Sequence, residues 1–115
     1  MTGIVNLTKK NVPNLPWEKI KNKILGKDYN LSIVLAGNKR MLGLNKKHRG
    51  KNKIADTLSF PLSKKEGEIF LNAGGNPEKM LFCFIHSLLH LKGLKHGRSM
   101  SENEQKSLKI FKKLL

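Results

Sequence analysis

The stretch that decides the fold reads PEKMLFCFIHSLLHLKGLKH and spans residues 77–96. Residues 80–85 are apolar on every side of a helix, which predicts a helix at the centre of the domain. Asn76, just before the stretch, is a preferred N-cap residue, and Pro77 suits the first helical position. Gly93 predicts that this helix ends near residue 91.

Three of the four histidines of the chain lie in this segment. His86 and His90 are four residues apart, so on a helix both imidazoles lie on one face and can share a metal ion. Gly93 allows the chain to turn back and bring His96 to the same ion. Three neutral imidazoles with one open position are typical of a catalytic zinc site, in which bound water becomes a nucleophile near neutral pH. Two core histidines and a surface one are the alternative, which is disfavoured because burying unpaired imidazoles is costly.

The rest of the chain alternates between short apolar runs and helical spacing, with Pro and Gly between them. Ser101 and Glu104 form the pattern of a capping box at the start of a last amphipathic helix, whose apolar stripe is Leu108, Phe111 and Leu115. The predicted order is β-α-β-α-β-β-α-α, an α+β class in which helices pack around a small mixed sheet of about four strands. The predicted strands are residues 2–8, 29–36, 57–62 and 68–72, and the predicted helices are residues 17–25, 38–47, 77–91 and 101–114.

The chain has 115 residues, the size of one compact domain, and we expect residues 1–115 to form it. Lys and Arg number 23 and Asp and Glu 8, so the net charge is +15. This charge favours polyanions as partners, nucleic acid first and an anionic membrane second. We expect a cytoplasmic protein, because no apolar run approaches the ~18 residues of a membrane span, no signal-peptide pattern occurs, and a single cysteine, Cys83, cannot form an internal disulfide.

Basic residues are concentrated between residues 39 and 53, a segment without any acidic residue. Each phosphate contact adds affinity and salt dependence, about −0.7 per contact in the log–log slope for single strands. We interpret this segment as the side of the protein that faces nucleic acid, although a solvated surface is an alternative for any single lysine. The predicted nucleic-acid-binding residues are Lys39, Arg40, Lys46, Lys47, Arg49, Lys51 and Lys53.

Three sequence blocks, taken together, resemble one known family. The pattern His86-x-x-x-His90-x-x-Gly93-x-x-His96 resembles the metal motif of the YbeY family of bacterial endoribonucleases. Residues 44–61 contain Leu-Asn, Arg-Gly-Lys and Asp-Thr-Leu-Ser-Phe-Pro in this order, which is similar to a second block of that family. Residues 67–69, Gly-Glu-Ile, are similar to a third block.

The resemblance implies a small sheet with helices packed around a zinc site, with one Zn²⁺ per chain held by His86, His90 and His96. It implies that Arg49 is the basic residue of the active-site groove, where a guanidinium can hold a phosphate through two hydrogen bonds and stabilise developing charge. The implied activity is cleavage of single-stranded RNA in 16S ribosomal RNA 3′-end maturation and in ribosome quality control. The implied partners are single-stranded RNA, the 16S rRNA precursor, and the ribosome or small-subunit proteins, without a membrane.

Two other functions fit parts of the sequence. A ribosome-associated RNA-binding protein with a structural or residual zinc site is suggested by Lys95, which places a positive charge beside His96. The short glycine-rich link at residues 73–76 suggests the same function, because this family usually carries a longer helical segment there. A metallopeptidase is disfavoured, since Ser87 stands where peptidases of the His-Glu-x-x-His type carry their general base.

Four further side chains near these motifs have functional alternatives. His48 could transfer a proton near pH 7, but an exposed loop histidine without a role is the simpler interpretation. Cys83 could be a fourth metal ligand, but its place in an apolar run favours a buried core thiol. Asp56 and Glu68 could orient histidines through hydrogen bonds, or could lie at a strand edge.

Overall fold

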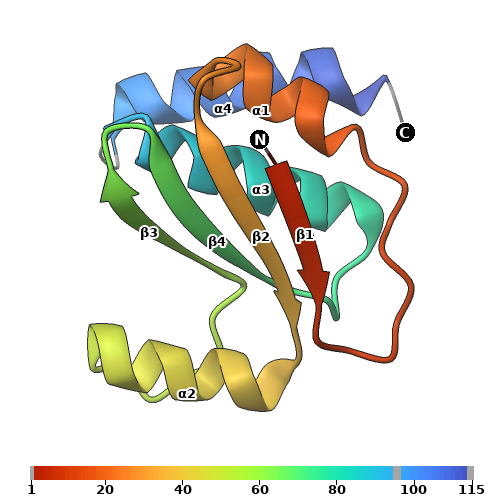
Figure 1. The fold of residues 1–115 in the computed structure, drawn as a ribbon, viewed down its shortest axis with the longest axis vertical. Coiled ribbons are helices and arrows are strands. Elements are labelled where there is room, and N and C mark those ends of the chain that lie inside the picture. Colours follow the sequence, from red (N-terminus) through yellow and green to blue (C-terminus); the bar gives the residue numbers. More distant parts are fainter. Residues whose placement is uncertain (1, 95–96, 114–115) are drawn as a thin grey trace.

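A computed structural model describes residues 2–94 and 97–113, and its elements follow the predicted order (Figure 1). Four strands and four helices confirm the α+β class. The strands are β1 (Thr2–Asn6), β2 (Asn30–Ala36), β3 (Thr57–Ser63) and β4 (Glu66–Asn72). The helices are α1 (Trp17–Leu25), α2 (Asn38–Arg49), α3 (Pro77–Leu91) and α4 (Arg98–Lys112).

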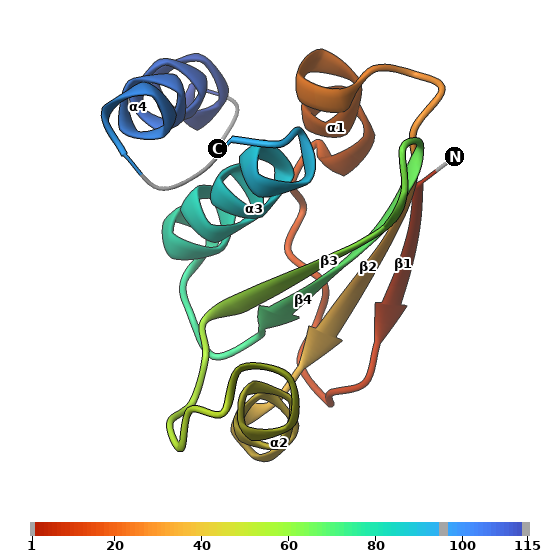
Figure 2. The ribbon, with the colours of Figure 1, turned by 90° about the vertical axis from the view of Figure 1, so that its left-hand side faces the viewer.

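The four strands form one mixed sheet in the spatial order β1-β2-β4-β3. β2 pairs in parallel with both β1 and β4, whereas β3 and β4 form an antiparallel hairpin. β1 and β3 are therefore the edge strands, as Figure 2 shows. Pro61 lies on β3 beside a register irregularity at Ser63, a place where the missing N–H of proline is tolerated.

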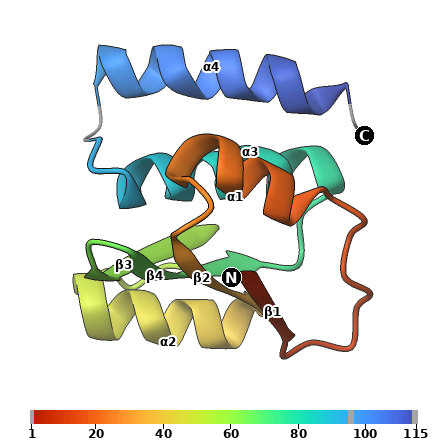
Figure 3. The same cartoon turned by 45° about the horizontal axis from the view of Figure 1, so that its top comes forward.

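α1 and α3 lie side by side on one face of the sheet, and α4 covers α3 on the side away from the sheet (Figure 2 and Figure 3). Because successive strand residues point to opposite faces, Ile33 of β2 and Ile69 of β4 both point toward α3. They join one buried cluster with Phe84 and Ile85 of the helix, and all four are 0% exposed. Apolar neighbours on several sides explain why residues 80–85 carry no polar face. Although α3 is apolar, neither it nor any other helix in residues 2–94 and 97–113 is long enough and apolar enough to cross a membrane.

α2 packs against the opposite face of the sheet, directly after β2 ends (Figure 2). A second, smaller cluster forms there from Met41 and Leu58, with the partly buried Phe70 against it. Asn45 is also buried on α2, and its amide nitrogen donates to the carbonyl of Lys53 at 2.9 Å. This bond holds the segment that connects α2 to β3.

The end of α2 differs from the sequence prediction in a way that matters for the site. The helix continues to Arg49 rather than residue 47, because Gly50 adopts the left-handed conformation, with φ of 66°, and ends the helix there. His48 and Arg49 therefore lie on the last helical turn, and the prediction of a loop from residue 48 was wrong.

α4 begins three residues before its predicted start, with a glycine at the N-cap and no capping hydrogen bond from a side chain. The predicted capping box of Ser101 and Glu104 is therefore wrong, since both residues lie inside the helix. The apolar stripe is confirmed for Phe111, which is buried, and for Leu108, which packs against the core. Leu115 lies outside the described residues.

The strand boundaries also differ slightly from the predicted ranges. β1 ends at Asn6 rather than residue 8, because the Asn6 side-chain oxygen accepts hydrogen bonds from the N–H and hydroxyl of Thr8 and forms a local turn. β3 extends to Ser63 and β4 begins at Glu66, so the hairpin turn is shorter than predicted.

Lys21 on α1 is 0% exposed and supports the connection from α1 to β2. Its ammonium donates to the carbonyls of Tyr29 at 3.0 Å and Gly26 at 3.3 Å. The same ammonium lies 3.8 Å from the carboxylate of Glu18. A buried cation is tolerated here because backbone carbonyls and a carboxylate surround it.

Replacing Lys21 with methionine is expected to lower the free energy of unfolding by about 2–3 kcal/mol, because buried carbonyls lose their donor. Urea denaturation measures this change. The matched control is Lys23→Met on the same helix, where the side chain is exposed and the change should stay within about 0.5 kcal/mol. Equal losses in the two variants would contradict the assigned role of Lys21.

Candidate active site

His86 and His90 lie one turn apart near the C-terminal end of α3 and face each other. Their Nε2 atoms are 3.1 Å apart, and both side chains are partly exposed. Two imidazole nitrogens that bind one tetrahedral zinc ion at about 2.0–2.1 Å lie about 3.3 Å from each other. The pair therefore fits a shared metal ion with little movement.

Glu104 of α4 holds the His86 ring in place. The carboxylate oxygen of Glu104 lies 2.5 Å from His86 Nδ1, and the side chains are only 11% and 22% exposed. A carboxylate accepts, so Nδ1 carries the hydrogen and the Nε2 lone pair points toward His90. Carboxylates on the second ring nitrogen are typical of metal-binding histidines, because they fix the tautomer and raise the basicity of the ligand.

Sequence reasoning missed this role of Glu104, which the capping-box pattern had assigned to the helix start. A usable signal existed in the spacing of α4. Glu104 lies four residues from both Met100 and Leu108, so it interrupts the apolar stripe of this helix with a carboxylate on the buried face. Only the packing of α4 on α3 shows that His86 is its partner.

The predicted third ligand, His96, and its neighbour Lys95 lie outside the described residues. Of the flanking chain, Gly93 ends α3 with a positive φ of 106°, as predicted for a turn, whereas α4 begins at Arg98, before its predicted start. In the ranges 2–94 and 97–113, no three His, Cys, Asp or Glu side chains converge on one metal position. A complete zinc site therefore depends on His96 and stays a prediction.

The histidine pair opens into a cleft of about 470 Å³ between α3, β3 and the end of α2. Arg49 lines this cleft from the last turn of α2, together with His48. Phe60 of β3 also lines the cleft. Its ring contacts the His48 ring edge-on, with the ring centroids 5.0 Å apart. Arg49 and His86 are 37 positions apart in the sequence, and the fold brings both to the same cleft.

A hydroxyl pair connects β3 to α3 within this cleft. Thr57 donates from its hydroxyl to the carbonyl of Phe70 at 3.1 Å, so the 2.5 Å contact between the Thr57 and Ser87 oxygens uses the Ser87 proton. Ser87 is buried and has no carboxylate, so it cannot act as the general base of a peptidase. Ser87, the residue that disfavours a peptidase, therefore has a structural role, because it joins α3 to β3.

The seven predicted nucleic-acid-binding residues do not form one surface. Arg49 lines the histidine cleft, whereas Lys39, Arg40 and Lys47 line a separate groove of about 730 Å³ on the other side of α2, beside Leu7. Lys46, Lys51 and Lys53 are exposed and line neither cavity. A strand of RNA in contact with all seven would have to pass around α2.

Within residues 2–94 and 97–113, the two carboxylates that the sequence suggested as possible partners of the histidines have other surroundings. Asp56 lies 3.4 Å from the Lys79 ammonium. Glu68 is on the sheet face opposite α3, since it alternates with Ile69, which points toward α3. For His86, the carboxylate that holds the ring is that of Glu104.

Cys83 is a buried thiol of α3, as predicted. Burial, and after it the negative charge of Asp56, raises the pKa of Cys83 to about 11. The thiolate is the reactive form and the usual zinc ligand, so a pKa this high makes Cys83 a poor metal ligand near neutral pH.

Cys83 is expected to react slowly with a thiol reagent at pH 8, roughly a hundredfold more slowly than in the urea-unfolded chain, because its thiolate is correspondingly rarer. The raised pKa means that the folded state holds the proton more tightly. Stability should therefore fall as pH rises from about 9 to 11, relative to Cys83→Ala measured in parallel. Labelling rates that match in folded and unfolded protein would contradict this.

The chain matches known proteins over most of its length. A sequence model of the family described as Endoribonuclease YbeY matches residues 5–114. The protein named Endoribonuclease YbeY from Pelagibacter ubique is 38% identical to this chain, over 83% of this chain and 69% of that protein. Proteins of the same name from Thermodesulfovibrio yellowstonii and Helicobacter pylori (strain Shi470) are 33% and 30% identical, over 74% and 97% of this chain and 64% and 90% of their own lengths.

One solved structure supports the fold independently of these sequences. The solution structure of TM1509 from Thermotoga maritima superimposes with a TM-score of 0.65, at 23% identity, over 94% of this chain and 87% of that one. This likeness concerns the fold alone, whereas the sequence match extends through the histidine segment and α4. The chain therefore belongs to the YbeY family.

Proposed function

We propose that this protein is an endoribonuclease that cleaves single-stranded RNA with one zinc ion held by His86, His90 and His96. The observation that carries the proposal is the 3.1 Å approach of the two Nε2 atoms in a cleft that Arg49 also lines. The shared name of the relatives, Endoribonuclease YbeY, supports the same reaction class.

Each side chain of the cleft has a distinct chemical task in this proposal. Zinc, when bound, supplies a Lewis acid that polarises the phosphodiester. Glu104 holds His86 in the tautomer that presents Nε2 to the ion. The guanidinium of Arg49 binds two phosphate oxygens and stabilises the charge that develops when phosphorus becomes five-coordinate.

The net charge of +15 supports a polyanionic substrate, which we propose to be the 3′ end of the 16S rRNA precursor on the small subunit. The partners in this proposal are the ribosome and small-subunit proteins, and the setting is the cytoplasm. Arg49 contacts the strand at the cleft, and Lys39, Arg40 and Lys47 hold a more distant part of it on the other side of α2. Binding should weaken with salt in proportion to the number of phosphate contacts.

The test is cleavage of a labelled single-stranded RNA that carries a ribosomal 3′ end. Wild-type protein should cut it, lose activity to a chelator and regain it with zinc. Arg49→Ala should reduce the cleavage rate at saturating RNA by about a hundredfold, because one donor to the developing charge is lost. Arg40→Ala is the matched variant on the same helix, and it should weaken binding and lower the salt slope by about 0.7 without a comparable loss of rate.

Other outcomes of the same experiment have clear meanings. If wild-type protein binds RNA with a steep salt dependence but cuts nothing, the chain is an RNA-binding protein with a structural or residual zinc site. Equal cutting by all three samples would mean that a contaminating nuclease is responsible. A peptidase is not supported, because Ser87 has no carboxylate to act as a base.

A further inference from the structure

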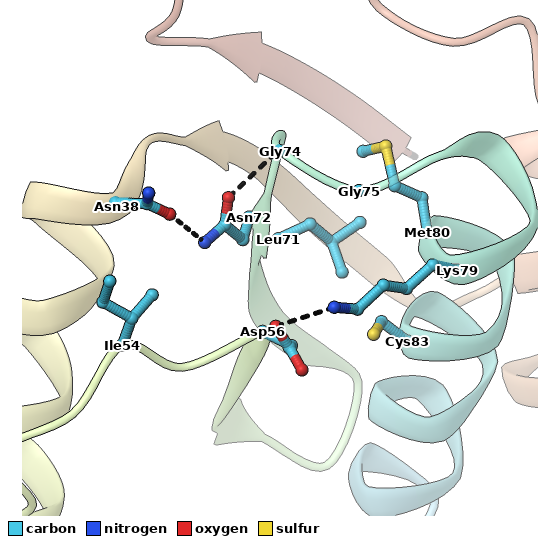
Figure 4. A pocket seen from close by; sticks show the side chains of 10 residues that line it. All are labelled: Asn38, Ile54, Asp56, Leu71, Asn72, Gly74, Gly75, Lys79, Met80 and Cys83. Atoms are coloured by element: carbon cyan, nitrogen blue, oxygen red, sulfur yellow. Dashed lines mark hydrogen bonds and ion pairs between the residues drawn. The ribbon is translucent and has the colours of Figure 1, made fainter.

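A second crevice lies beside the candidate active site, at the carboxyl ends of β2 and β4 (Figure 4). Its volume is about 270 Å³. β2 leads into α2 on one face of the sheet, and β4 leads through residues 73–76 into α3 on the other face. Crevices between neighbouring parallel strands whose connections diverge in this way are the usual ligand sites of open sheets.

Two polar pairs face each other across the crevice, and Figure 4 shows both. The Lys79 ammonium lies 3.4 Å from one carboxylate oxygen of Asp56. The Asn72 amide nitrogen donates to the Asn38 side-chain oxygen at 2.8 Å, and Asn72 is itself oriented by the N–H of Gly74 at 2.9 Å. The second oxygen of Asp56 can therefore accept from a ligand, while Lys79 and the amide nitrogen of Asn38 can donate to it.

The crevice and the histidine cleft follow one another along the same face of α3. Lys79 and Cys83 line the crevice, whereas Ser87 and His90 line the cleft. These positions are three or four residues apart, so they lie in one row on the helix surface. A single-stranded ligand that crosses the contact between Thr57 and Ser87 would reach both cavities.

The segment that enters β3 lies across both cavities from α3. Its residue Asp56 lines the crevice, and the next residue, Thr57, lines the cleft. The hydroxyls of Thr57 and Ser87 contact each other where the cleft borders the crevice, so the two cavities are neighbours separated by this contact. From Cys83 to Ser87 the helix rises about 6 Å, which is one helical turn. The neighbouring cavity is thus within the reach of the nucleotide next to the one whose phosphate lies at the histidines.

We propose that the crevice is a base-recognition subsite for the nucleotide beside the cleaved phosphodiester and that it prefers guanine. This inference rests on the proposed endoribonuclease function. Guanine presents N1–H and an exocyclic amine beside the O6 acceptor, so Asp56 accepts from the first two while Lys79 or Asn38 donates to O6. The volume lies just below the ~300–1,000 Å³ of typical small-molecule pockets, which suits a single base.

The binding test uses guanosine 5′-monophosphate and inosine 5′-monophosphate, which differ only in the exocyclic amine. Each is titrated into ¹⁵N-labelled protein, and the amide resonances of Gly74 and Gly75, which line the crevice, are followed. Guanosine 5′-monophosphate should shift both resonances and bind about tenfold more tightly than the inosine nucleotide. In Asp56→Asn this tenfold ratio should disappear.

The matched control is Asp28→Asn. Asp28 is an exposed carboxylate with its own lysine partner, Lys65 at 3.9 Å, and it lies outside the crevice. This variant should keep the tenfold ratio between the two nucleotides. Equal affinities for the two nucleotides in wild-type protein, or unmoved Gly74 and Gly75 resonances, would overturn the proposal.

The cleavage test uses a randomised single-stranded RNA and sequences the product ends. Wild-type protein and Asp28→Asn should enrich guanine about tenfold at one fixed position next to the cut, and Asp56→Asn should lose this enrichment. Cutting without base preference would overturn the subsite and leave the endoribonuclease function intact. Selective nucleotide binding without any cutting would retain the guanine site and overturn the endoribonuclease function.

Discussion

Replacing His90 with alanine is expected to abolish RNA cleavage, by about a thousandfold or more, and to remove zinc from the purified protein. The Nε2 atoms of His86 and His90 lie 3.1 Å apart, so the variant deletes one of the two converging imidazoles that we propose to hold the ion. A Lewis acid contributes several kcal/mol of transition-state stabilisation, which is lost with the ion. Elemental analysis gives the zinc content, and single-turnover cleavage gives the rate.

The zinc affinities of two glutamate variants on α4 separate an effect on metal binding from an effect on folding. Glu104→Gln should weaken zinc binding about tenfold to a hundredfold, because a carboxylate partner of a metal-binding histidine becomes a neutral amide. Glu102→Gln on the same helix is the matched control, since Glu102 is exposed and pairs with Arg98. Full zinc content in His90→Ala, or equal zinc affinities in the two glutamate variants, would contradict the proposed site.

Replacing Phe84 with alanine is expected to lower the free energy of unfolding by about 3–5 kcal/mol. Phe84 is 0% exposed at the centre of α3 and contacts Trp17 of α1 edge-on, with ring centroids 4.9 Å apart. The truncation removes buried apolar area and leaves a cavity between the helix and its neighbours. A domain of this size has a total stability of about 5–15 kcal/mol, so this one substitution should remove a large share of it.

Urea denaturation of three variants tests the position of α3 in the core. Phe84→Leu should cost much less than Phe84→Ala, because most of the side-chain volume is retained. Leu62→Ala, on the exposed edge strand, should change stability by less than about 0.5 kcal/mol, since Leu62 is 60% exposed. A small effect of Phe84→Ala would contradict the central position of α3.

The sequence predicts α3 with the bounds that the structure has, because its end signals are local. The Asn76 side-chain oxygen accepts from the N–H of Lys79 at 2.8 Å, and Pro77 occupies the first position, as their residue types suggest. At the other end Gly93 adopts a positive φ. All these interactions join residues within a few positions of each other, so sequence spacing alone contains the information.

The start of α4 shows where local patterns are insufficient. Ser101 and Glu104 match a capping box, but the helix starts earlier and Glu104 contacts His86 of α3 instead. His86 and Glu104 are 18 positions apart, and their contact depends on how α3 and α4 pack. The Glu104 carboxylate could either cap its own helix or contact α3, and its burial against α3 favours the contact with His86.

The sequence alone determined the apolar central helix, the spacing of His86 and His90, the basic charge and the family. The first three depend on helical periodicity and composition, and the family on the resemblance of three sequence blocks, so none of them requires knowledge of distant neighbours. The tertiary structure alone decided that Glu104 orients His86 and that the remaining basic side chains lie away from the histidine cleft, where Arg49 lies as the resemblance implied. The strand order β1-β2-β4-β3 and the packing of α2 and α4 set these contacts, because each joins elements that are far apart in the chain and no local spacing specifies their distance.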